Sequence, residues 1–198
     1  MNEKIKTVVL SDTDILVHMV SGGIFFEVVP LVFETVYIPA KVEQELKDKH
    51  SHTYYKLLRH LNEGNLLKRT KLEWGGLSVE QKKLVNTTKT RLRARLDPGE
   101  LDCYAYSLGM EIDAIISDDK GAKELISLDS EGSKVVITFW DIIILAIKMD
   151  QLDWTTGELY YNKVVQTCRL SLPPFGKQIY EFENYIGTHE WINKFLGI

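Results

Sequence analysis

Short apolar runs alternate with longer amphipathic stretches along most of this chain. The short runs are rich in β-branched and aromatic residues, which is typical of buried strands, whereas the longer stretches repeat their apolar residues at helical spacing. Strands that alternate with helices favour an α/β fold with a central parallel sheet of about four to five strands, flanked by helices in three layers. The predicted strands cover residues 8–10, 36–38, 66–72, 114–116 and 135–138.

The same pattern predicts how the 198 residues are divided. Residues 1–153 are expected to form one α/β domain, with a helical insertion at about 50–95. Residues 154–198 are expected to form a helical extension that packs on this domain or on a partner. The predicted helices cover residues 15–20, 40–49, 53–64, 79–95, 101–110, 120–128, 140–149, 155–170 and 177–195.

Two of the predicted strands end abruptly in carboxylates. Asp12 and Asp14 follow the first strand, and Ser117, Asp118 and Asp119 follow the strand at 114–116. Because the carboxyl ends of parallel strands lie at one edge of a sheet, where ligands bind, we expect these acids to share a site.

The helix at 40–49 carries two further acids, Glu43 and Glu45. Residues two apart on a helix point about 200° from each other, so at most one of them can share a site with Asp12. Glu45 belongs to the inward-facing stripe, and Glu43 is expected to be solvated. The alternative is that both are surface charges.

Three acids, Asp97, Glu100 and Asp102, surround the start of the helix at 101–110. Helix capping explains one of them. The other two suggest a second use, and the spacing leaves open whether Glu100 or Asp102 reaches the site.

Carboxylates gathered from four elements repel one another unless a cation neutralises them. Oxygen ligands without cysteine or clustered histidine indicate Mg²⁺ or Mn²⁺. Two such ions, about 3.5–4 Å apart, can activate a water and stabilise the leaving oxygen of a phosphodiester.

The net charge of −4 argues against a general polyanion binder, but the helix at 79–95 has six cations and one acid. Such a run is usually a solvated face. The alternative is an edge that contacts phosphates. Its candidate contacts are Lys89, Arg91, Arg93 and Arg95.

Several features favour a soluble, cytoplasmic protein. Residues 1–6 are too short and polar for a signal peptide, and the apolar run at 139–149 is too short to span a bilayer. The two cysteines, Cys103 and Cys168, lie in apolar helical patterns and are interpreted as reduced core residues.

Four motifs, in their order and spacing over residues 6–150, resemble the PIN-domain nucleases, a family that includes the VapC-type toxins. They are Asp12-Thr13-Asp14, Ile38-Pro39-x-x-Val42-x-x-Glu45-Leu46, Leu96-Asp97-x-Gly99-Glu100-x-Asp102 and Ile116-Ser117-Asp118-Asp119-Lys120.

The resemblance implies a metal-dependent endoribonuclease, with RNA as substrate and with an antitoxin, another inhibitor protein or a homodimer as possible partners. By position it makes Asp12, Glu45, Asp102 and Asp119 the metal-binding catalytic acids, with Asp14 and Ser117 as supporting residues. Glu100 competes with Asp102 as a ligand, and Asp118 competes with Asp119.

Two other functions fit part of the pattern. Asp12-Thr13-Asp14 is also similar to the nucleophile motif of haloacid-dehalogenase-type phosphatases, but Leu16 stands where that family has Thr or Val, and Glu45 would have no role. The third interpretation is a catalytically inactive RNA-binding or interaction module. The free-energy cost of a buried acid cluster without a metal argues against it.

Overall fold

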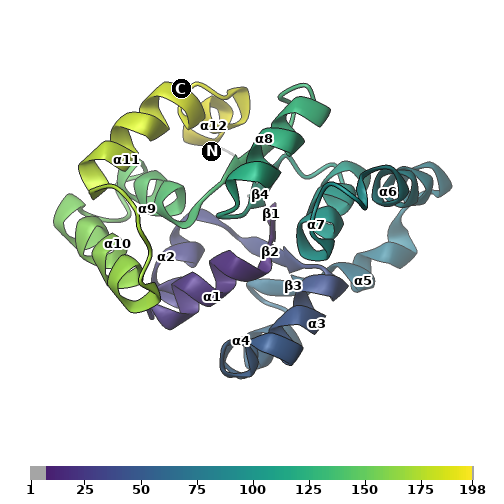
Figure 1. Cartoon of the computed structure of the whole chain (residues 1–198), viewed down its shortest axis with the longest axis horizontal. Coiled ribbons are helices and arrows are strands. Elements are labelled where there is room, and N and C mark those ends of the chain that lie inside the picture. Colours follow the sequence, from purple (N-terminus) through teal and green to yellow (C-terminus); the bar gives the residue numbers. More distant parts are fainter. Residues whose placement is uncertain (1–7, 198) are drawn as a thin grey trace, which may run out of the picture.

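Five parallel strands form the central sheet of the computed structural model, which describes residues 8–197. Their order across the sheet is β3-β2-β1-β4-β5, so the first strand lies in the middle. The fold is the predicted three-layer α/β/α arrangement (Figure 1). The strands are β1 (Val8–Ser11), β2 (Thr35–Ile38), β3 (Leu67–Arg69), β4 (Ala114–Ile116) and β5 (Val135–Ile137).

Helices cover both faces of this sheet. The chain runs from β1 through β2 to β3 in one direction and then returns to β4 and β5, so right-handed crossovers put the helices between β1 and β3 on one face and those between β3 and β5 on the other. The elements of the first part are α1 (Thr13–Ser21), α2 (Phe25–Val32), α3 (Ala40–Lys49) and α4 (Ser51–Glu63). Those between β3 and β5 are α5 (Thr70–Glu73), the 3₁₀ turn η1 (Trp74–Gly76), α6 (Val79–Leu92), α7 (Pro98–Gly109) and α8 (Lys120–Asp129).

The strand register brings the acid-bearing junctions together. Ser11 of β1 lies opposite Ile116 of β4, and the Asp12 N–H continues this pairing by donating to the Ile116 carbonyl at 3.0 Å. Residues 9–11 of β1 and all of β4 are buried, so the chain leaves the core at the same level in each. The edge of the sheet at Ser11 and Ile116 is therefore where the acids meet.

The C-terminal part is helical and packs on the domain. Its elements are α9 (Phe139–Lys148), α10 (Trp154–Cys168), α11 (Phe175–Glu181), the π-helical turn η2 (Phe182–Ile186) and α12 (Glu190–Leu196). Helix α10 lies against α1 and α9, and α11 lies against α9 (Figure 1). Gly157 permits the close approach of α10, since a Cβ there would lie 2.6 Å from Ile147 Cδ1.

The predicted helix at 177–195 is interrupted. A turn at Gly187 and Thr188 separates η2 from α12, and the His189 side chain accepts the Trp191 N–H at 3.1 Å, which starts a new helix. Periodicity could not show this break because the apolar pattern continues across it.

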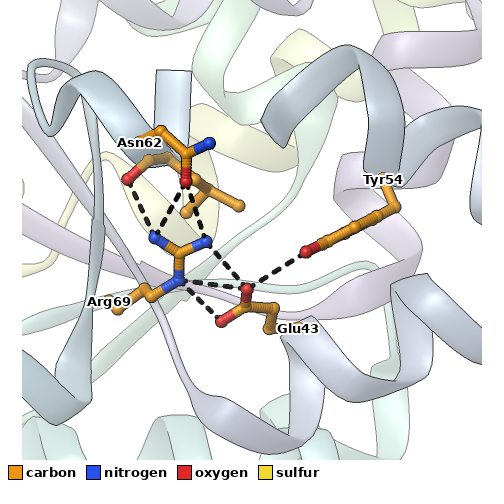
Figure 2. A network of polar contacts seen from close by, with 5 residues as sticks. Glu43, Tyr54, Asn62 and Arg69 are labelled. Carbon is orange, nitrogen blue, oxygen red and sulfur yellow. Dashed lines mark hydrogen bonds and ion pairs between the residues drawn. The ribbon is translucent and has the colours of Figure 1, made fainter. Parts of the chain in front are cut away.

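The segment 50–95, expected to be a helical insertion, also supplies β3, the edge strand of the sheet. Arg69 at the end of β3 forms a polar network with α3 and α4 (Figure 2). Its Nε donates to Glu43 Oε2 and its Nη2 to Glu43 Oε1, both at 2.9 Å, while Nη1 donates to the Leu61 carbonyl at 3.1 Å. The Tyr54 hydroxyl also donates to Glu43, at 3.4 Å.

This network corrects the expectation that Glu43 is solvated. Burial raises the pKa of Glu43, but the Arg69 guanidinium outweighs burial and holds the pKa below its ordinary value. Glu43 therefore fixes α3 to β3, and the opposite face of α3 is left for Glu45.

No helix within residues 8–197 is long and apolar enough to cross a membrane. The prediction made for residues 1–6 lies outside the described part of the chain.

Candidate active site

A pocket of about 420 Å³ lies at the carboxyl ends of the strands, where β1 enters α1. Side chains from α1, α3, the start of α7 and the start of α8 line it. Its lining residues are Asp12, Thr13, Asp14, Lys41, Gln44, Glu45, Asp48, Lys49, Asp97, Pro98, Gly99, Glu100 and Asp119. Acids from four separate elements thus share one pocket, as the strand pattern predicts.

Asp12 is the innermost of these acids, with 6% of its surface exposed. It occupies the N-cap position of α1, yet its carboxylate makes no side-chain capping hydrogen bond. None of the ion pairs found among residues 8–197 involves it. Burial, followed by the charges of Glu100, Asp14 and Glu45, raises the pKa of Asp12 to about 7, against a smaller lowering by the backbone at Thr13. Asp12 is therefore a buried carboxylate without a compensating cation.

Glu45 approaches Asp12 from α3. Its Oε2 accepts a hydrogen bond from the Thr13 hydroxyl at 2.9 Å, and its Oε1 lies 2.7 Å from Lys49 Nζ. The pKa of Glu45 is lowered, chiefly by the Lys49 ammonium. Thr13, which sequence reasoning did not single out, ties α3 to the start of α1.

Gly99 brings the first turn of α7 against both acids. A Cβ at this position would lie 2.8 Å from Asp12 Oδ1 and 3.7 Å from Glu45 Oε2. Any larger residue would displace a carboxylate or the helix. Its position in the motif Asp97-x-Gly99-Glu100 is the signal that could have identified it.

Glu100 is the α7 acid that reaches the pocket. Its Oε2 accepts the Asp97 N–H at 3.2 Å, so it also caps the helix. Burial, then the charges of Asp119, Asp97 and Asp14, raises the pKa of Glu100 to about 7, against a lowering by that backbone hydrogen bond.

Asp102, predicted as the catalytic ligand of this helix, does not line the pocket. Two residues along a helix reverse the direction of the side chain, and Asp102 points to α6, where its Oδ1 lies 2.7 Å from Lys89 Nζ. Asp102 is 7% exposed and paired, so its charge is already compensated.

Asp119 lines the pocket and Asp118 does not. Asp119 caps α8 through Oδ1, which accepts the Ala122 N–H at 2.6 Å, and its own N–H donates to the buried Ser117 hydroxyl at 3.2 Å. Ser117 thus supports the turn that presents Asp119.

Asp118, the predicted competitor of Asp119, makes two contacts within the fold. Its Oδ1 accepts the Phe139 N–H at the start of α9, at 3.0 Å, and its Oδ2 lies 2.7 Å from His18 Nδ1. Burial opposes the charge of His18, but Asp118 outweighs burial and raises the pKa of His18 above its ordinary value. Both oxygens of Asp118 therefore hold the fold together.

The basic helix α6 is not part of the pocket. Lys89 pairs with Asp102 and lies over the Tyr106 ring, 4.5 Å from its centroid, and Arg91 pairs with Asp129. Lys89 and Arg91, two of the predicted phosphate contacts, are thus already paired with acids of the fold. Arg93 and Arg95 follow the helix and are exposed.

The lining residues fit a hard divalent cation. Asp12 supplies a buried negative charge without a partner, and Glu45, Glu100 and Asp119 supply further carboxylate oxygens from three other elements. Within residues 8–197 no three acid, histidine or cysteine side chains are already drawn together as a cation site. The flexible Glu45 and Glu100 side chains would have to move toward Asp12.

A larger groove of about 550 Å³ lies near the amino ends of the strands, lined by Val8, Asp113 and residues of α12 such as Trp191. Its lining within the described part of the chain includes no buried acid comparable to Asp12. The carboxyl-end pocket is therefore the better candidate for chemistry.

Comparison with protein-family models, with curated proteins and with solved structures gave no match to this chain.

Proposed function

We propose that the protein is a metal-dependent endoribonuclease of the PIN-domain type. One observation carries this proposal: the buried, uncompensated Asp12 lines an open pocket together with Glu45, Glu100 and Asp119, each from a different element. An open, acid-lined pocket suits the hydrolysis of a charged phosphodiester with bound cations.

Mg²⁺ or Mn²⁺ bound by these acids would neutralise the scissile phosphate and promote attack by water. Asp12 would be the central ligand, because burial makes its charge the most costly to leave without a cation. Thr13 holds one oxygen of Glu45 and so limits its rotation toward Asp12. The α8 cap holds Asp119 by one oxygen and leaves the other for a ligand.

The pocket favours this reaction over the two alternatives. A phosphatase that uses Asp12 as nucleophile would give Glu45 and Glu100 no role, yet both point at the same pocket. An inactive module would bear the free-energy cost of the buried Asp12 charge without using that charge to bind a cation.

A circular single-stranded RNA provides the sharpest test, because it has no ends and only an endonuclease can linearise it. We expect linearisation with Mg²⁺ or Mn²⁺ and at least about a 100-fold loss of rate with excess chelator. A phosphomonoester substrate, incubated in parallel, should not be hydrolysed. Hydrolysis of the phosphomonoester alone would support the phosphatase, and RNA binding without cleavage under either metal would support the inactive module.

Gly99→Ala tests how closely α7 must approach the metal-binding acids. The added Cβ would lie 2.8 Å from Asp12 Oδ1, so we expect about a 10-fold or greater loss of cleavage and a loss of about 1–3 kcal/mol in the free energy of unfolding. Gly176→Ala is the matched control, because a Cβ added there would meet open space among residues 8–197. Wild-type cleavage by Gly99→Ala would show that α7 does not define the site.

A further inference from the structure

Two of the residues within 8–197 that line the pocket are cationic, Lys41 and Lys49, both from α3. They lie four residues before and four residues after Glu45, so all three share one face of the helix. The two lysines are about 12 Å apart along the helix axis. They therefore flank the acid, one at each side of the pocket.

The hydrogen bonds of Glu45 decide which of its oxygens a cation can take. Oε2 is held by the hydroxyl of Thr13, which is buried, whereas Oε1 is held by Lys49. The side chain of Lys49 is 68% exposed, and exposed pairs of this i,i+4 kind contribute little and exchange readily. Oε1 is therefore the oxygen that a metal ion would take, and Lys49 is the group that must leave it.

The released ammonium stays at the rim of the pocket on a flexible stem. There it would meet whatever anion the bound cation attracts, which for the proposed function is a phosphate of the RNA strand. Lys41 can contact a neighbouring phosphate, since no ion pair found among residues 8–197 uses its ammonium.

We propose that Lys41 and Lys49 bind the phosphodiester backbone of the substrate, with Lys49 exchanging from Glu45 to a phosphate when a cation occupies Glu45. The inference rests on the proposed function and extends it to the substrate-binding residues. The phosphate contacts at the site then come from α3 and not from the helix at 79–95. Lysine is a point charge that reads no base, so these contacts give affinity without sequence preference.

The test uses Lys41→Gln, Lys49→Gln and the double variant, with Lys47→Gln as the control. Lys47 is on the same helix and loses the same charge, but it does not line the pocket. Binding of Mn²⁺ is measured by calorimetry. Binding of a labelled single-stranded RNA is measured by fluorescence anisotropy with Ca²⁺, over a series of salt concentrations.

Lys49→Gln should bind Mn²⁺ about 2- to 5-fold more tightly, because a competitor for Glu45 is gone. Each pocket variant should bind RNA about 3- to 10-fold more weakly, and the slope of log affinity against log salt should fall by about 0.7 per lysine. Lys47→Gln should match the wild type in both measurements.

Unchanged RNA affinity and salt slope in the double variant would overturn the inference, as would unchanged or weaker Mn²⁺ binding by Lys49→Gln. Suppose that the wild type linearises RNA and binds Mn²⁺, and that Asp12→Asn abolishes the Mn²⁺ binding. Either of these outcomes would then exclude the lysines as substrate contacts and leave the proposed function standing. If the wild type binds no Mn²⁺, the proposed function fails and the inference with it.

Discussion

Asp12→Asn should abolish RNA cleavage and at the same time make the protein more stable. The substitution keeps the shape of the side chain but removes the charge at the centre of the pocket, so we expect at least about a 1000-fold loss of kcat/KM. At pH 8 without divalent cations, we expect the free energy of unfolding to rise by about 1–3 kcal/mol, because a buried charge without a partner is removed.

The gain in stability has a predictable pH dependence. The pKa of Asp12 is raised in the folded chain from 3.8 to about 7, so the folded chain binds this proton more tightly than the unfolded chain. The stability that the proton provides is present at low pH and is lost as the pH rises through about 7. The variant and the wild type should therefore unfold alike near pH 4 and differ most above pH 7.

Urea unfolding across this pH range, with chelator present, measures the difference. Asp150→Asn is a suitable control, since Asp150 is exposed, has a φ of 56° that Asn tolerates, and does not line the pocket. A less stable Asp12→Asn at pH 8 would mean that the Asp12 carboxylate has a stabilising partner. Cleavage at the wild-type rate would remove Asp12 from the mechanism.

Glu100→Gln and Asp102→Asn should have opposite effects, although the two acids are two residues apart. Glu100→Gln keeps an oxygen that can accept the Asp97 N–H but loses the charge in the pocket, so we expect about a 100-fold loss of kcat/KM with no loss of stability. Asp102→Asn breaks the pair with Lys89, so we expect a loss of about 1–3 kcal/mol in stability and cleavage within about 3-fold of the wild type.

This pair of variants tests which acid of α7 is the ligand: the structure favours Glu100, whereas the motif favours Asp102. Cleavage assays at a temperature where both variants are folded give the first quantity, and urea unfolding gives the second. Loss of cleavage in Asp102→Asn with normal cleavage in Glu100→Gln would restore Asp102 as the ligand.

Much of the fold could be predicted from the sequence because buried parallel strands are continuous apolar runs and amphipathic helices repeat at 3.6 residues. The convergence of Asp12, Glu45 and an acid after β4 followed from the same pattern, since parallel strands share one carboxyl edge. Periodicity could not predict which residue of the fold each acid pairs with.

Asp102 and Asp118 illustrate this limit. Helical geometry states that Glu100 and Asp102 diverge, but the direction of each depends on Lys89 in α6. Likewise, the Asp118 side chain turns inward because it pairs with His18, which lies one hundred residues earlier in the sequence. Charge alone also made the helix at 79–95 a candidate RNA surface, although Lys89 already has its partner within the fold.

The central position of β1 has a consequence for the order in which the site is assembled during synthesis. Ser11 pairs with Ile116, more than a hundred residues later, and Asp119 follows directly. A growing chain on the ribosome therefore holds Asp12 and Glu45 long before it holds the acids of α7 and α8. The pocket is completed only when the chain has emerged as far as α8, so under the proposed function a nascent chain would remain inactive toward its own messenger RNA until that point.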